Sequence, residues 1–458
     1  MHRLSGLDAG FLYLETPTQL LHVCGLIVLD PTTIPDGYRF ETLRAGLAVR
    51  LPAVPLFRQK IADSPFNLDH PVWVDDPDFD LDRHLHRVAV PAPGRREELA
   101  ELCGHIAAQP LDRSRPLWEM TVIEGLEDGS VAVMTKIHHA GADGVTGAEL
   151  VAQLCSLEPD APRPDPVADG AGGGSALEIA LGGLFNVATR PLGLVRALPK
   201  TVELLPRWIS RARRGEAMPA PFTAPRTSFN GTITGHRSVG FTQFDLDRVK
   251  AVKDAHGVKV NDVVMAVCAG ALRRYLTERD ELPDSPLIGM VPVSVRGTSD
   301  RPGRNQVSPM FASLHTHITD PIERLHAIAD ANACAKEHNS ALGASLLQDW
   351  TQFMAPAVFG TAMRMYASLR LAERHPVVHN LVVSNVPGPA APLYFLGARI
   401  RGMYPLGPIF HGVGLNVTVM SLDGALDVGV LACPELVPDL WSLVDGFPAA
   451  LEELETSR

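Results

Sequence analysis

A proline- and glycine-rich stretch divides the chain into two parts and limits the folds that it can adopt. Residues 158–174 read EPDAPRPDPVADGAGGG, with four prolines followed by a run of glycines. Proline lacks the backbone donor that helices and sheets need, and glycine runs stay flexible, so this stretch predicts a linker. The chain has 458 residues, and each part is long enough for a core of its own.

Strand and helix patterns alternate on both sides of the linker, which predicts an α/β fold. We expect three units, at 1–157, 158–230 and 231–458. The expected strands are 23–29, 88–90, 117–123, 131–137, 241–244, 287–295, 381–385 and a hairpin of 416–420 with 425–431 around Asp423-Gly424; the expected helices include 40–50 and 97–108.

Capping residues predict further helices in the last unit. Asp245 and Asn261 are each placed to cap a helix. Pro438 can open a C-terminal helix that ends at Gly446, and Pro448 then allows a last short helix to about Leu454.

The region from 176 to 214 is basic, although the whole protein has a net charge of −11. It carries seven lysines and arginines against two glutamates, and it interleaves them with apolar residues that include Trp208. Two compatible interpretations remain open. The region is either a helical connector between the domains or a surface helix that meets anionic lipid.

Composition excludes several classes of protein. An acidic chain with a net charge of −11 is a poor nucleic-acid binder. The six cysteines form no CxxC pair, which argues against a zinc ribbon and fits a reducing cytoplasm, and the N-terminus lacks the apolar core of a signal peptide. The uncharged stretches 375–398 and 402–422 contain several prolines, so we expect buried strands with turns rather than membrane spans.

The segment 131–154 carries the strongest sign of chemistry. The side chains of its first residues, 131–137, alternate between two faces as in a buried strand. Gly141 and Gly144 then end the strand pattern, and a capping box begins a helix. His138, His139 and Asp143 therefore lie on a tight turn at the edge of a sheet, where active sites often form.

A histidine on this turn could act as general base on a substrate hydroxyl, since it exchanges a proton near neutral pH. Adjacent strand residues point to opposite faces, so His138 and His139 should not share one task. Asp143 could hold a ring or pair with an arginine. Other interpretations stay open: ordinary buried histidines, metal ligands, or a phosphate cradle made by Gly141 and Gly144, although no further metal ligands appear at useful spacing.

The turn also resembles a known motif. His138-His139-Ala-Gly-Ala-Asp143-Gly144 is similar to the HHxxxDG motif of the CoA-dependent acyltransferase superfamily, and other segments resemble bacterial wax ester synthase/diacylglycerol acyltransferases in the same order along the chain. These segments are LDA at 7–9, FLYLETPT at 11–18, HPVW at 70–73, DPDFD at 76–80, RPLWE at 115–119, NDVV at 261–264, VPVSVR at 291–296 and SNVPGP at 384–389.

The resemblance implies a fold and an activity. It implies two chloramphenicol-acetyltransferase-like domains, with mixed sheets flanked by helices and a substrate tunnel between them. His139 would be the general base and His138 a supporting residue. Asp143 would brace the turn with Gly144 through an ion pair, for which Arg296 is a candidate partner. Asn385, at the end of a strand, could donate a hydrogen bond to the oxyanion or fix a turn.

The same resemblance implies the substrates. Acyl-CoA would be the co-substrate, with no bound cofactor or metal, and diacylglycerol or a long-chain alcohol would be the acceptor. We expect a cytoplasmic enzyme in peripheral contact with the inner face of the plasma membrane or with lipid droplets. Two alternatives remain: an enzyme acting on a polyketide or carrier-bound acceptor, and a non-catalytic lipid-binding relative. One departure from the family pattern, Arg304 inside Gly303-Arg-Asn-Gln-Val-Ser308, makes the substrate fit less certain.

Overall fold

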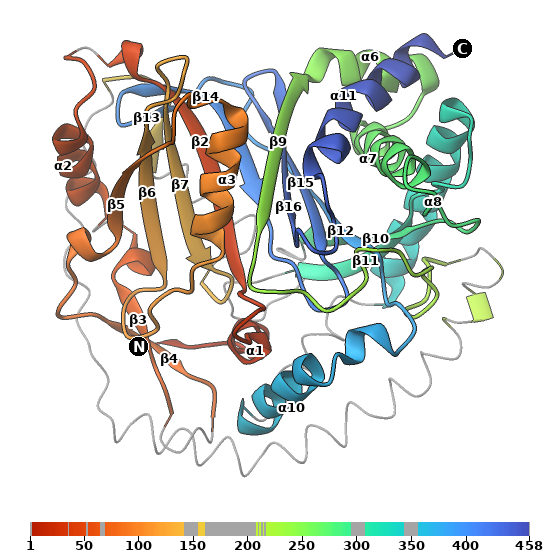
Figure 1. The fold of residues 1–458 in the computed structure, drawn as a ribbon, viewed down its shortest axis with the longest axis horizontal. Coiled ribbons are helices and arrows are strands. Elements are labelled where there is room, and N and C mark those ends of the chain that lie inside the picture. The colour runs from red at the N-terminus through yellow and green to blue at the C-terminus, as the bar shows by residue number, and fades with distance from the viewer. Residues whose placement is uncertain are drawn as a thin grey trace.

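Two mixed β-sheets lie side by side, with most helices on their outer sides and one helix, α3, between them (Figure 1). This computed structural model describes residues 2–34, 36–51, 54–64, 69–141, 154–160, 208, 210–211, 214, 217–294, 307–342 and 356–457. The expected two-part α/β architecture is therefore confirmed. Most of 158–230 lies outside the described residues, so the unit boundaries at 157 and 231 stay a prediction.

The first sheet has seven strands and carries the turn that the sequence singles out. Helix α1 (Gly6–Leu14) lies beside this sheet, and α2 (Phe40–Arg50) and α3 (Arg96–Ala107) flank it. A small separate sheet has the order β1 (His2–Arg3), β4 (Val72–Asp75) and β3 (Gln59–Ala62). The seven strands follow the order β5 (Leu85–Ala89), β6 (Trp118–Glu124), β7 (Val131–His138), β2 (His22–Asp30), β14 (Ala398–Leu406), β13 (Tyr394–Phe395) and β8 (Cys155–Ser156).

The second sheet has six strands and the larger group of helices. Helices α6 (Leu246–His256), α7 (Val260–Thr277), α8 (Pro321–Leu342) and α11 (Leu440–Thr456) pack around it, while α10 (Pro356–Ser368) lies apart, next to α1 (Figure 1). The strands follow the order β11 (Val307–Ser313), β10 (Ile288–Ser294), β12 (Leu381–Val386), β15 (Leu415–Leu422), β16 (Ala425–Ala432) and β9 (Ser238–Asp245).

Most expected elements are confirmed within a few residues of their predicted ends. Helix α2 has the predicted bounds, and Asp245 caps α6 through its side chain. The Asp423-Gly424 turn joins β15 to β16 as predicted, with positive φ at both turn residues. Strand β5 begins earlier than expected, at Leu85.

The predicted cap at Asn261 is wrong. Helix α7 begins one residue earlier, and its N-cap is Lys259, whose backbone N–H donates to the Asp262 carboxylate. Asp262 also accepts a hydrogen bond from Asn332 of α8, at 2.9 Å. The helix start is therefore fixed by a buried carboxylate on its third residue, a role that the capping signal of Asn261 obscured.

The predicted break at Gly446 is also wrong, because α11 runs through both Gly446 and Pro448. Gly446 serves a close approach between helices: a Cβ there would lie 3.3 Å from the Cα of Ala271 in α7. A Cβ added to Gly270 of α7 would likewise lie only 2.7 Å from the Cβ of Ala450 in α11. Burial of this apolar helix face offsets the backbone hydrogen bond that the internal proline removes.

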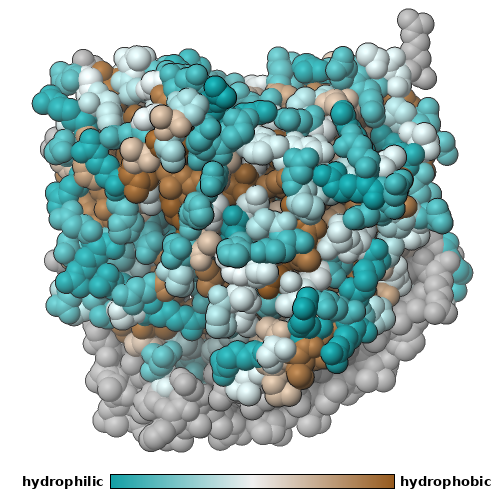
Figure 2. Space-filling view, in the orientation of Figure 1, coloured by the Kyte–Doolittle hydropathy of each residue, from teal (hydrophilic) through white to brown (hydrophobic). Residues whose placement is uncertain are grey.

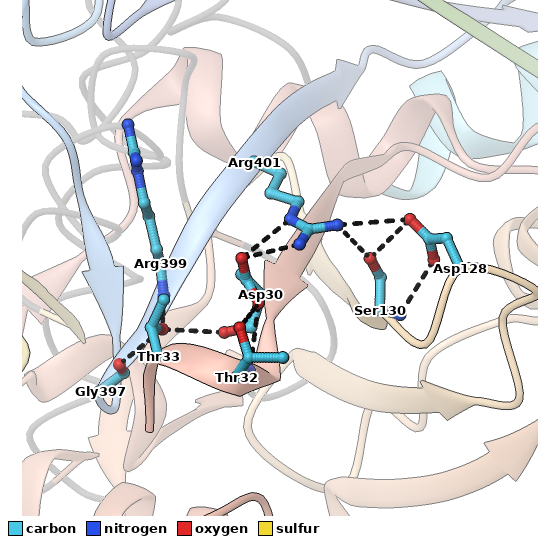
Figure 3. A network of polar contacts seen from close by, with 8 residues as sticks. All are labelled: Asp30, Thr32, Thr33, Asp128, Ser130, Gly397, Arg399 and Arg401. Atoms are coloured by element: carbon cyan, nitrogen blue, oxygen red, sulfur yellow. Dashed lines mark hydrogen bonds and ion pairs between the residues drawn. The ribbon is translucent and has the colours of Figure 1, made fainter. Parts of the chain in front are cut away.

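A strand from late in the chain completes the first sheet. Strand β14 pairs antiparallel with β2, with a bulge between Ile400 and Gly402. At the bulge, Arg401 binds the carboxylate of Asp30 on β2 at 2.7 Å and reaches Asp128 and Ser130 in the β6–β7 turn (Figure 3). Late and early parts of the chain thus share one sheet.

Two features are absent from the described part of the chain. None of its helices is long and apolar enough to cross a membrane. No group of histidine, cysteine, aspartate and glutamate side chains within it could hold a metal ion.

Candidate active site

The site is built on the turn that follows strand β7. The backbone N–H of His139 donates to the carbonyl of Leu21 at 2.8 Å, and the N–H of Gly141 donates to the carbonyl of His138 at 2.8 Å. A Cβ on Gly141 would lie 2.7 Å from a methyl group of Leu56, so glycine allows the chain to turn against the core here. These contacts hold the two histidines at the edge of the sheet.

His138 is completely buried and holds the turn from inside. Its Nδ1 accepts a hydrogen bond from the backbone N–H of Ala140 at 3.0 Å, so the neutral ring carries its proton on Nε2. Nε2 lies 3.2 Å from Oε1 of Glu15. His138 therefore has no exposed face, and its supporting role stays a prediction.

Glu15, just after helix α1, is the centre of a buried polar group. Its carboxylate accepts a hydrogen bond from the N–H of Leu21 at 3.1 Å and pairs with Arg113, and its Oε1 lies 3.6 Å from Nε2 of His22. Burial alone would raise the pKa of Glu15, but His138 and Arg113 more than offset this and hold the pKa below its usual range. Glu15 is therefore ionised at neutral pH.

His22 stays neutral beside this carboxylate. It is the register partner of His138 across β2 and β7, and burial is the main cause that lowers its pKa to about 3. The carboxylate of Glu15 opposes this shift only partly. The pair of strands thus places two imidazoles on one carboxylate.

The second half of the chain holds the loop that follows Glu15. The guanidinium of Arg237 donates to the carbonyl of Thr18 at 2.7 Å, and the N–H of His411 donates to the side chain of Gln19 at 2.7 Å. His411 Nε2 also lies 3.3 Å from the hydroxyl of Thr16. Both halves therefore hold the loop that carries the Glu15 carboxylate, next to the turn after β7.

His139 faces a different environment. Its ring stacks on Phe11 of α1, with centroids 4.0 Å apart and the planes 14° from parallel, and its side chain remains partly exposed. The two adjacent histidines thus have separate neighbours, as the strand pattern predicted. Of the two histidines, only His139 is partly exposed.

Comparison with known proteins gives this arrangement a family. Residues 4–264 match the wax ester synthase/diacylglycerol acyltransferase catalytic domain, and residues 304–455 match the C-terminal domain of the same family. The chain belongs to the wax ester synthase/diacylglycerol acyltransferase family. The resemblance drawn from the sequence is therefore confirmed, and the protein is an acyltransferase.

Relatives of this acyltransferase match it over nearly its whole length. A Mycobacterium tuberculosis protein provisionally named a diacylglycerol O-acyltransferase is 54% identical over 99% of this chain and 90% of its own. The solved wax ester synthase/diacylglycerol acyltransferase of Marinobacter aquaeolei VT8 is 31% identical, with a TM-score of 0.71 over 99% of both chains. The first condensation domain of the CDA synthetase, at 15% identity and a TM-score of 0.59 over 99% of this chain and 96% of its own, shares the fold.

Several predicted site residues of the acyltransferase lie outside the described residues. These are Asp143, Gly144 and Arg296, and the Arg304 departure lies there too. Asn385 is described, and its side-chain amide donates to the side-chain oxygen of Asn261 at 3.2 Å. This contact joins β12 to the first turn of α7, so it supports the structural alternative for Asn385; its role toward an oxyanion stays a prediction.

Sequence reasoning missed Glu15. The FLYLETPT segment was noticed only as a family resemblance, because a carboxylate between a leucine and a threonine has no chemical signature of its own. The signal that could have found it is its place at the end of the first helix, opposite the strand that begins at His22.

Proposed function

We propose that this acyltransferase moves a long-chain acyl group from acyl-CoA to diacylglycerol and so makes triacylglycerol. Long-chain alcohols are the second class of acceptor and would give wax esters. The observation that carries the proposal is the partly exposed His139 at the edge of the first sheet, in a chain of this family. The names of the relatives support diacylglycerol as the acceptor.

His139 acts as the general base in this proposal. Its imidazole takes the proton of the acceptor hydroxyl while the oxygen attacks the thioester carbonyl. The tetrahedral oxyanion then collapses, the carbon–sulfur bond breaks, and the departing CoA sulfur receives the proton from the imidazolium. No covalent acyl-enzyme is required. The stacking of Phe11 on the imidazole supports this role because it favours one orientation of the ring.

Asp143 braces the turn in the same proposal, with Gly144 allowing the backbone to bend and Arg296 as the ion-pair partner. We expect an Asp143→Asn variant to lose about 3 kcal/mol in the free energy of unfolding, because the charge of its partner would be left unpaired. Its activity should fall as well. Thermal and urea unfolding alongside turnover provide the measurement. Unchanged unfolding with lost turnover would instead place Asp143 in the chemistry.

The test of the function uses the purified full chain with long-chain acyl-CoA and a panel of acceptors. Release of free CoA thiol and formation of the lipid product are both followed. We expect triacylglycerol from diacylglycerol and a smaller yield of wax ester from a fatty alcohol. Thiol release without an ester product, or an ester formed only on a carrier-bound acceptor, would refute the proposal.

We also propose peripheral contact with a membrane or lipid-droplet surface on the cytoplasmic side. Both lipid substrates are insoluble in water, so the enzyme must collect its acceptor at such a surface. The sequence points to the basic region 176–214 for this contact, but most of that region lies outside the described residues.

A further inference from the structure

Three large apolar side chains are exposed around helix α10. Met365 lies in the last turn of the helix and Leu369 directly follows its end; they are 57% and 49% exposed. Phe222 is 57% exposed, and its backbone has a φ of 68°, which is rare for a residue with a side chain. Its ring packs edge-on against His375, which in turn binds the hydroxyl of Tyr366 on α10.

Figure 2 shows hydrophobic side chains at the surface where α10 lies in Figure 1, next to hydrophilic ones. We call Phe222, Met365 and Leu369, with the three arginines described next, the α10 surface. Exposed apolar side chains that gather on one surface usually mark a contact site, because exposure of apolar area to water is unfavourable.

The charges of this surface are positive, in contrast to the rest of the protein. Between Asp349 and Arg399 the only charged residues are Arg364, Arg370, Glu373 and Arg374. Glu373 pairs with Arg370 at 2.7 Å. Within the described part of the chain, no carboxylate pairs with Arg364 or Arg374, and both are exposed. Exposed apolar side chains beside unpaired arginines match a surface of anionic lipid.

The α10 surface lies close to the candidate active site. Helix α10 packs against α1, the helix whose Phe11 stacks on His139. A Cβ on Gly360 would lie 3.8 Å from the carbonyl of Tyr13, so the two helices are in close contact. Tyr366 also approaches His411, with ring centroids 6.5 Å apart, and His411 holds the loop after Glu15.

We propose that the α10 surface docks the enzyme on an anionic phospholipid surface and thereby places the site beside the lipid that holds the acceptor. This inference rests on the proposed function, since only a lipid acceptor requires such delivery. The apolar side chains enter the acyl boundary while the arginines meet phosphate groups. Docking would bring α1, and with it the side of His139 that Phe11 lines, next to the lipid.

The basic region 176–214 is the other candidate for docking. The structure argues against a lipid-facing role for one of its residues. Trp208, which the sequence offered as a lipid-facing residue, packs against the core of the second half instead. Its indole N–H donates to the carbonyl of Met218 at 3.0 Å, and its ring lies 6.3 Å from that of Phe311. Trp208 is therefore not free to enter a lipid surface.

Vesicle co-sedimentation of the full chain tests the proposal. The probes are vesicles of phosphatidylcholine alone and of phosphatidylcholine with phosphatidylglycerol. We expect tighter binding to the anionic vesicles, and roughly a tenfold or greater loss for Met365→Ser/Leu369→Ser and for Arg364→Gln/Arg374→Gln. All four side chains are exposed, so the variants should fold normally. Turnover of a short, soluble acceptor should stay unchanged, while turnover of vesicle-borne diacylglycerol should fall.

Matched controls change the same chemistry elsewhere. Val49→Ser/Leu157→Ser removes two exposed apolar side chains from the first half, and Arg248→Gln/Arg274→Gln removes two exposed arginines from α6 and α7. Both control variants should bind vesicles as the wild type does. A Ser replacement of Arg207, Arg211, Arg213 and Arg214 tests the competing region.

Three results would overturn the docking proposal: normal vesicle binding by the α10 variants, loss of binding only in the connector variant, or a dimer in solution that the α10 variants dissolve. Failure of the proposed function would look different. The wild type would then bind vesicles through α10 but form no ester even with the soluble acceptor.

Discussion

Replacing His139 by alanine is expected to lower the rate of ester formation by about 10²–10⁴-fold while the protein remains folded. The ring is partly exposed and stacks on Phe11, so its removal should leave the core of the first half intact. The loss should appear in kcat, because a general base acts on the transition state. Initial rates with acyl-CoA and a soluble acceptor provide the measurement.

His138→Ala is the matched control one residue away. His138 is buried and binds the backbone of Ala140, so its loss should destabilise the fold more and depress turnover less than the loss of His139. If folded His139→Ala protein turned over at a near-normal rate, the general-base mechanism would be refuted.

Replacing Glu15 by glutamine should lower both stability and turnover, although Glu15 is not itself a base for the substrate. We expect a loss of about 1.5–3 kcal/mol in the free energy of unfolding, the usual worth of hydrogen bonds to a charged group. Turnover should fall by roughly 10²-fold, since Glu15 positions His138 and the turn, and a displacement of about 1 Å can cost that much. Urea unfolding and steady-state kinetics measure the two effects.

The effect of Glu15 should depend on pH in a defined direction. Because the pKa of Glu15 in the folded protein lies below its usual value of 4.5, the ionised carboxylate stabilises the fold above that pH. The contribution disappears as the pH falls below 4.5 and toward the folded-state pKa. The difference in stability between wild type and Glu15→Gln should therefore shrink in acid.

Arg113→Gln is the matched control for Glu15. It removes the partner of Glu15 that is half exposed, at 53%, and leaves His138, His22 and the Leu21 N–H in place. Its effect on turnover should be small. Equal losses of turnover in both variants would show that the ion pair, and not the carboxylate beside the histidines, orders the turn.

Local patterns predicted the regular elements of this fold well. The alternation in 131–137 gave β7 almost to the residue, and the helical spacing in 40–50 gave α2. Such elements are specified by their own apolar periodicity. The turn signal of Asp423-Gly424 likewise needed no partner outside its hairpin.

The wrong predictions share a physical cause, which is packing between distant segments. Gly446 looked like a helix end because its contact with Ala271 is invisible in a linear reading. Asn261 looked like a cap because the bond from Asn332 to Asp262 joins two helices 70 residues apart. Glu15 needed His138 from across the sheet before its role could be seen.

The position of β14 late in the chain delays completion of the first sheet during synthesis. Strands β2 and β7 are complete once His138 has been made, but β14, which ends at Leu406, follows about 270 residues later. At a synthesis rate of roughly 5–20 residues per second, this interval is roughly 15–50 s.

During that interval the outer edge of β2 has no neighbour, although its side chains are largely apolar. An unpaired apolar edge is a template for pairing with other nascent chains, so a chaperone that covers it has time to act. The first sheet is completed only after most of the second half has left the ribosome. The turn that bears His139 therefore reaches its final structure at that late stage.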